Sequence, residues 1–134
     1  MKAIFRPLVV ASLIAAVINQ ILYFVATEAF GQEFLLAQGE PMGIPFFAPA
    51  MLSIFQGIVG GVIVAWVASR TKSPQNVWLS ISLIALALSF VLPFGGILGF
   101  EAALWLNAMH AVAGALIIPM VRSSLSAGPR ASDS

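Results

Sequence analysis

Residues 8–27 read LVVASLIAAVINQILYFVAT, an uncharged apolar run that begins just after Arg6 and ends just before Glu28. Its length matches the roughly 20 residues that a helix needs to cross a bilayer. Four such runs occupy about 7–27, 46–69, 76–93 and 99–121. The runs are continuous rather than alternating, and lipid cannot satisfy free backbone amides, so each run predicts a spanning helix.

The charges between the runs alternate in sign along the chain. Basic residues precede the first run, separate the second from the third and follow the fourth: Lys2, Arg6, Arg70, Lys72, Arg122 and Arg130. Acids fill the other two connections: Glu28, Glu33, Glu40 and Glu101, with Asp133 in the tail as the exception. Membrane insertion retains Lys and Arg on the cytoplasmic side. The pattern therefore predicts an up-down-up-down bundle in the plasma membrane, with both termini in the cytoplasm.

The composition excludes most soluble classes. The 134 residues are 60% hydrophobic and 8% charged, with a mean hydropathy of +1.03, whereas about 25% of residues are charged in a typical soluble domain. Four spans leave no room for a nucleotide-binding or nucleic-acid-binding domain. We therefore predict an all-α integral membrane domain over residues 1–122, with lipid as its surroundings, and a disordered cytoplasmic tail over 123–134, SSLSAGPRASDS.

A cleaved signal peptide is the alternative for the first run. Residues 1–6 form a basic segment, and Ala29-Phe30-Gly31 has the small-x-small form of a cleavage site. However, the apolar run exceeds the usual 7–15 residues of a signal peptide, and Asn19-Gln20 interrupts it. We therefore expect an uncleaved first helix.

The connections predict a compact bundle. Ser73 is a candidate cap for the third helix, and Pro74 suits its first position, where no amide donor is needed. Residues 94–99, FGGILG, predict a short turn in which glycines adopt positive φ. Glu101 falls in the first turn of the fourth helix, where the helix dipole favours an anion. Gly57 and Gly61 predict close packing, most simply against a helix of the same chain.

Polar residues within the spans share one depth. Counted at 1.5 Å per residue, they fall in the middle to outer layer of the bilayer: Asn19, Gln20, Ser53, Gln56, Ser89, Asn107 and His110. Two interpretations remain open. The residues either join the helices by hydrogen bonds, which average about 0.6 kcal/mol in membranes, or line an intramembrane site for a solute, proton or lipid headgroup. In either case we expect Asn19 or Gln20 to approach Gln56, Asn107 or His110.

The chain has few residues of the kinds that catalysis or metal binding requires. The chain has no Cys, one His, and no acid within a span. One imidazole cannot complete a metal site alone, and a Ser nucleophile would lack the acid that orients its base. We therefore predict no catalytic, metal-binding or cofactor-binding residues and no enzyme activity.

Three segments resemble a family of small, uncharacterised bacterial four-helix membrane proteins, a domain of unknown function. They are NQILY at 19–23, the Ser-x-x-x-Pro at 89–93, and LNAMHAVAGALIIPMV at 106–121. The resemblance implies the fold and the polar layer but no activity. The long connection with Glu33 and Glu40 departs from that pattern.

The expected function is a structural or accessory component of the membrane. The alternative is a transporter or channel-like protein for a small solute, ion or proton, with the polar layer as its site. The partners we expect are the lipid bilayer, further copies of the chain or other membrane proteins, and no nucleic acid.

Overall fold

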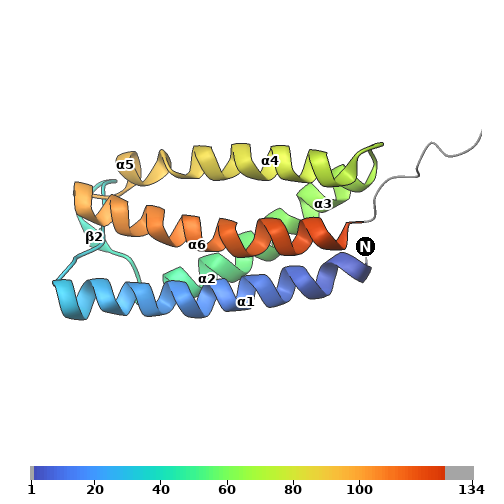
Figure 1. The fold of residues 1–134 in the computed structure, drawn as a ribbon. Helices are drawn as coiled ribbons and strands as arrows, with labels where there is room; N and C mark the ends of the chain where they lie inside the picture. The colour runs from blue at the N-terminus through green and yellow to red at the C-terminus, as the bar shows by residue number, and fades with distance from the viewer. Residues whose placement is uncertain (1, 126–134) are drawn as a thin grey trace, which may run out of the picture.

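The computed structural model describes residues 2–125, which form four long helical rods (Figure 1). The first rod is α1 (Lys2–Phe24) continued by the π-helical turn η1 (Val25–Ala29), and the second is α2 (Ala48–Phe55), η2 (Gln56–Gly60) and α3 (Gly61–Ser69). The third is α4 (Pro74–Ser89) and α5 (Leu92–Gly96), and the fourth is α6 (Phe100–Ser124). The predicted all-α, four-helix bundle is confirmed. All four rods are long and apolar enough to cross a membrane.

The rods extend beyond the predicted spans. The first begins at Lys2 rather than near residue 7, since Pro7 lies close to the helix start and removes few hydrogen bonds. The third begins at Pro74, and the fourth continues to Ser124, so residues 123 and 124 belong to the helix rather than to a tail. Polar and charged residues at the ends extend a helix without adding to the apolar run. Leu125 follows the helix and is buried in the bundle, and residues 126–134 of the predicted tail lie outside the described residues.

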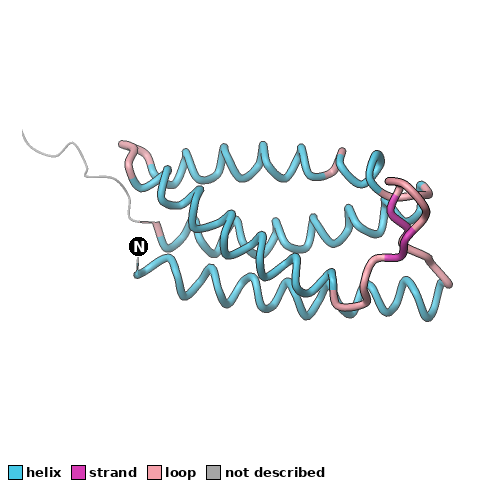
Figure 2. Tube along the Cα trace, turned by 180° about the vertical axis from the view of Figure 1, so that it is seen from behind, coloured by secondary structure: helices cyan, strands magenta, loops and turns pink. Residues whose placement is uncertain are grey.

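The second rod crosses the bundle diagonally. At its start α2 packs on α1, and at its end α3 packs on α4 (Figures 1 and 2). The fourth rod, α6, packs on both α1 and α4. Gly57 and Gly61 make the first crossing close, because a Cβ on either would overlap Ser12 or Leu8 of α1. The predicted packing of these glycines within the chain is confirmed.

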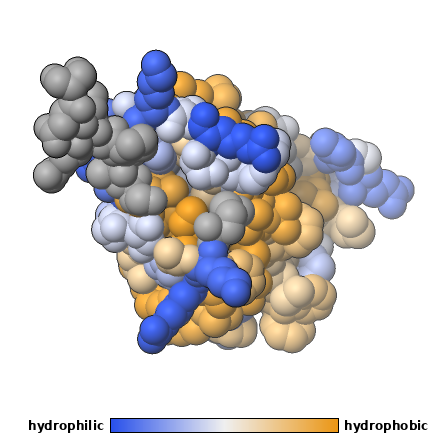
Figure 3. Space-filling view, turned by 90° about the vertical axis from the view of Figure 1, so that its right-hand side faces the viewer, coloured by the Kyte–Doolittle hydropathy of each residue, from blue (hydrophilic) through white to orange (hydrophobic). Residues whose placement is uncertain are grey.

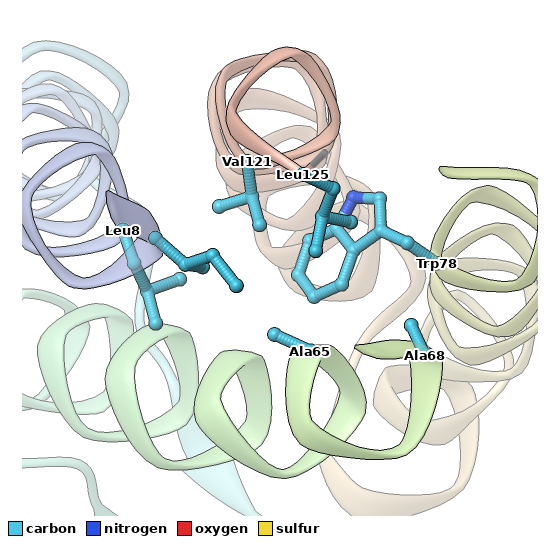
Figure 4. Packing of buried hydrophobic residues seen from close by; sticks show 7 residues of the cluster. Leu8, Ala65, Ala68, Trp78, Val121 and Leu125 are labelled. Atoms are coloured by element: carbon cyan, nitrogen blue, oxygen red, sulfur yellow. The ribbon is translucent and has the colours of Figure 1, made fainter. Parts of the chain in front are cut away.

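One end of the bundle carries basic residues, and we call it the basic end: Lys2, Arg6, Arg70, Lys72 and Arg122. Figure 3 looks onto this end and shows hydrophilic side chains projecting from a largely hydrophobic surface. Beneath them a buried cluster joins the four rods: Ile4, Leu8, Ala65, Ala68, Trp78, Val121 and Leu125. The Trp78 ring lies between α6 and α3 (Figure 4), and its Nε1 donates to the Ile118 carbonyl over 2.9 Å.

The opposite, acidic end carries Glu28, Glu33, Glu40 and Glu101. Here the connection that we predicted as a loop contains a short hairpin, β1 (Leu35–Leu36) and β2 (Met42–Gly43). Leu36 also pairs with Ile97, and the amide of Leu98 donates to the Leu35 carbonyl over 2.8 Å. Phe34, 4% exposed, stacks on Tyr23 with ring centroids 5.2 Å apart. The hairpin therefore caps this end of the bundle.

Two predicted details of the connections are wrong. Ser73 stands at the start of α4, but its hydroxyl makes no capping bond and its backbone carbonyl receives the first amides instead. Gly95 and Gly96 belong to the helical turn α5, and only Gly99 has the predicted positive φ, at 97°. After α4 ends at Ser89, the new helical turn α5 includes Pro93, because proline is tolerated in a first turn. Glu101 lies in the first turn of α6, as predicted.

Candidate functional site

The diagonal course of the second rod leaves a groove between it, α4 and α6. The groove has a volume of about 360 Å³, which falls within the range of about 300–1,000 Å³ that small-molecule sites occupy. Five of the seven candidate residues line it: Asn19, Ser53, Gln56, Ser89 and His110. Gln20 and Asn107 are not among the lining residues. The shared depth therefore brings together side chains from all four rods.

Asn19 and Ser53 form one wall as a hydrogen-bonded pair. Asn19 Nδ2 donates to Ser53 Oγ over 2.8 Å, and Ser53 Oγ donates to the Pro49 carbonyl over 2.7 Å. Because the hydroxyl proton is used on Pro49, Ser53 must accept from Asn19, which fixes the orientation of the amide. Asn19 Oδ1 is then a bare acceptor, buried and without a partner among residues 2–125. Asn19 lines the same groove as Gln56 and His110, but among residues 2–125 its side-chain hydrogen bond goes to Ser53 rather than to Gln56, Asn107 or His110.

Ser89 and His110 meet where the third rod breaks. Pro93 has no amide proton, so the Ser89 carbonyl lacks its usual helical donor four residues later. The His110 imidazole lies beside the Ser89 backbone. Its Nδ1 is buried and has no hydrogen-bond partner within the part of the chain that the structure describes. The Ser89 hydroxyl donates to the Leu86 carbonyl over 2.6 Å, so its proton is used within the third rod.

Asn107, one turn before His110, also bonds to the backbone where the third rod breaks. Its Nδ2 donates to the Phe90 carbonyl over 3.0 Å, and the Phe94 amide that would ordinarily reach this carbonyl donates to Val91 instead. A carbonyl can only accept, so Asn107 Oδ1 points elsewhere and is buried without a partner among the described residues. Asn107 therefore joins helices and satisfies a backbone group that the break exposes.

Gln20 lies outside the groove and ties two rods together. Its Nε2 donates to the Phe46 carbonyl over 2.7 Å, just before the start of α2. That carbonyl precedes the first turn of the helix, so the bond holds the entry of the second rod against α1. For Gln20 and Asn107 the structure favours the helix-joining interpretation of the polar layer.

Gln56 has the opposite character. It lines the groove, its side chain is exposed, and it makes none of the side-chain hydrogen bonds found within residues 2–125. It also begins η2, a π-helical turn. Single π turns inside α-helices occur frequently at functional sites, because they redirect side chains. Gln56 is the lining amide that remains free to bond something else.

Several further lining residues of the groove are not among the seven predicted site residues. Ser82 lies two helical turns before Ser89 on α4, and this spacing was the signal that could have found it. Gly60 and Trp78 also line the groove, but a glycine or a tryptophan in a spanning helix carries no such signal. Their place in the groove follows from the crossing of the rods.

The groove lining has a simple chemistry. It offers neutral hydrogen-bonding groups and one imidazole, and no Lys, Arg, Asp or Glu is among its residues. Such a lining suits an uncharged ligand, since an ion would have no opposite charge to replace its lost hydration.

Comparison with known proteins agrees with the resemblance seen in the sequence. A family described as "Family of unknown function (DUF6069)" matches residues 1–127. The chain belongs to the DUF6069 family. No curated protein and no solved structure matches it. The family has no assigned activity, so the function must be argued from the groove itself.

Proposed function

We propose that this chain is a non-catalytic integral membrane protein, an accessory component of the plasma membrane that binds a small uncharged ligand in the groove. The observation that carries the proposal is the groove itself, with Gln56 free at its edge and Asn19 Oδ1 bare in its wall. Gln20 and Asn107, outside the groove, each donate to a backbone carbonyl at another rod, whereas Gln56 makes none of the side-chain hydrogen bonds found within residues 2–125.

The outward faces of the rods support insertion. Large apolar side chains point away from the bundle, among them Val17, Ile84 and Leu88 at 61–63% exposure. Contiguous apolar surface of this kind is rare on soluble monomers and is typical of surfaces that contact lipid or a partner. The shortest rod has 22 residues, which at 1.5 Å each span about 33 Å, enough for a hydrocarbon core of about 30 Å.

The separation of charge supports an orientation. The five described basic residues lie at one end of the bundle and the four described acids at the other. With the basic end inside, both termini are cytoplasmic. Reporter fusions at Thr71 and after Ser126 should report a cytoplasmic location, and a fusion at Gly39 should report an external one. A cytoplasmic signal at Gly39 would overturn the four-span orientation.

Binding fits the groove better than catalysis does. General acid–base chemistry needs paired groups that exchange a proton with the substrate, and the lining supplies a single imidazole with no carboxylate beside it. The alternative of small-solute, ion or proton transport uses the same groove. Transport, however, needs a path through the bundle to the basic end, and the buried cluster around Trp78 fills that end (Figure 4). Binding is therefore the better-supported function.

The proposal is tested on the full chain purified in a mild detergent. Native mass spectrometry should detect a small non-covalent adduct on the parent protein. Gln56→Leu should lose the adduct and keep its thermal stability, because the exposed amide joins no helices. Gln20→Leu is the matched control outside the groove, and it should keep the adduct but lose stability. An adduct that persists in Gln56→Leu, or one absent from the parent, would contradict binding in the groove.

A further inference from the structure

The groove opens onto the outward surface of the bundle. Three of its lining residues are exposed, Leu52 and Gln56 on the second rod and Ala85 on α4. The opening follows from the diagonal crossing, since α2 stays with α1 while α4 stays with α6 (Figure 2). In an inserted bundle this surface faces lipid, so a ligand can enter sideways from the bilayer without passing through water.

The lining changes character along its length. Toward the acidic end it offers the polar groups of Asn19, Gln56 and His110. Toward the basic end it is made largely of apolar side chains, Val64, Trp78, Ile117 and Ile118, with Ser82 as the polar exception between the two halves. A ligand that matches both halves has a polar group at one end and an apolar chain at the other.

Gly60 keeps the apolar half open. A Cβ on Gly57, Gly61 or Gly114 would meet a neighbouring rod, which explains those glycines by packing. A Cβ on Gly60 would meet no heavy atom within 4 Å. Glycine in a helix is less favourable than alanine, and protein packing gives no reason for it at this position. Gly60 lines the groove, so the space beside it is the space that a ligand would fill.

Gln56 needs a partner at the opening. Its exposed amide lies in the third turn of the second rod, where lipid tails offer no hydrogen bonds and an unpaired polar group is costly. The bare acceptor Asn19 Oδ1 and the imidazole of His110 line the same polar half. A headgroup that both donates and accepts hydrogen bonds would satisfy the amide, and the uncharged lining favours a neutral one.

From these observations we infer that the groove binds a neutral single-chain amphiphile taken from the bilayer. Its hydroxyl-bearing head lies at Gln56, and its chain runs past Gly60 toward Trp78. The inference rests on the proposed function and names the class of ligand. Trp78 is 1% exposed and so is shielded from bulk lipid, while it still lines the groove. A chain seated in the groove would therefore reach a tryptophan that surrounding detergent does not.

That difference provides the test. The chain has three tryptophans, and Trp66→Phe with Trp105→Phe leaves Trp78 as the only one. The probe is a monoacylglycerol brominated at mid-chain, titrated into the full chain in unbrominated detergent, with bromine quenching of Trp78 fluorescence as the readout. We expect saturable quenching. Gly60→Leu, which fills the groove, and Gln56→Leu, which removes the head contact, should each raise the half-saturation concentration about tenfold.

Ala87→Leu is the matched control, because it adds a larger side chain to the exposed surface of α4, outside the groove lining, and should leave quenching unchanged. Far-UV circular dichroism verifies folding, and Gln56→Leu keeps the test decisive should Gly60→Leu misfold. Absence of saturable quenching, or equal quenching in all variants, would overturn the inference. Equal or tighter binding of the brominated fatty-acid anion would overturn the neutral head.

Two further outcomes separate the inference from the proposed function. Glycerol alone, a head without a chain, is tested for thermal stabilisation that Gln56→Leu abolishes. If glycerol stabilises and the brominated probe does not bind, the ligand is a polar solute, so the inference fails while the proposed function stands. If neither acts and no adduct is found, both fail. If Gln56→Leu converts a dimer to a monomer in light scattering, a second copy covers the opening and the inference also fails.

Discussion

Alanine at Gly57 should destabilise the bundle, because the second rod packs closely on α1 there. An added Cβ would lie 3.0 Å from Ser12 Cβ and 3.1 Å from Ile117 Cδ1, and it would overlap Ser12 Oγ outright. Ordinary contacts begin near 3.4 Å. Ser12 is fully buried, so its side chain has no free space to enter. The two rods must therefore move apart, which loosens every contact along their crossing.

The expected magnitude comes from a comparison with Gly60→Ala. Overpacking a buried site costs about 1–3 kcal/mol, while replacing glycine by alanine in a helix returns up to about 1 kcal/mol. Gly60 lies in the same π-helical turn and has open space around it. Its alanine variant therefore gains only the stabilisation that alanine gives a helix over glycine, which we call the helix term. The two variants should thus differ by about 1–3 kcal/mol in the free energy of unfolding, because the helix term cancels.

The assay is unfolding of the purified chain in mixed micelles by titration with dodecyl sulfate, followed by far-UV circular dichroism. Ser12→Gly in the Gly57→Ala background removes the atoms that clash and should recover much of the loss. Coupling between contacting residues of this kind is about 0.5–3 kcal/mol. Equal stability of Gly57→Ala and Gly60→Ala would refute the reasoning, since the close crossing would then not exist in the folded protein.

Three further variants test single contacts with the same unfolding assay. Trp78→Phe should lower the free energy of unfolding by about 1–2 kcal/mol, because the hydrogen bond from the indole N–H to the Ile118 carbonyl is lost while most of the apolar contact remains; an unchanged value would show that this bond is absent. Ser12→Ala should be neutral or stabilising, since Ser12 Oγ is buried with no partner among the described residues; a loss above about 1 kcal/mol would reveal a missed bond. Asn107→Leu should cost no more than about 1 kcal/mol, because the lost bond to Phe90 is offset by removal of the unpaired Oδ1.

The polar layer shows how far a count of residues along the chain can reach. Depth along a helix follows from 1.5 Å per residue, so the sequence placed Asn19, Ser53, Gln56, Ser89 and His110 in one layer, and the structure gathers them around one groove. Which atoms pair could not be read this way. Asn19 selects Ser53 over other groups at the same depth because helix rotation and crossing angle bring that hydroxyl within reach.

The sequence by itself determined four apolar helices, their order and the separation of charge between the two ends. These properties depend on the residues of each segment taken one by one. The free energy of transfer to lipid and the retention of positive charge change little with the helices that pack beside the segment. Tertiary structure decided the rest. The close approach at Gly57 and Gly61 tilts the second rod across the bundle, opens the groove beside Gly60, and leaves Gln56 exposed while Gln20 is paired. The capping hairpin and the side-chain partner of the Phe90 carbonyl at the break likewise depend on contacts between residues far apart in the chain. Such contacts are set by the fit of whole helices, which no local pattern of the sequence contains.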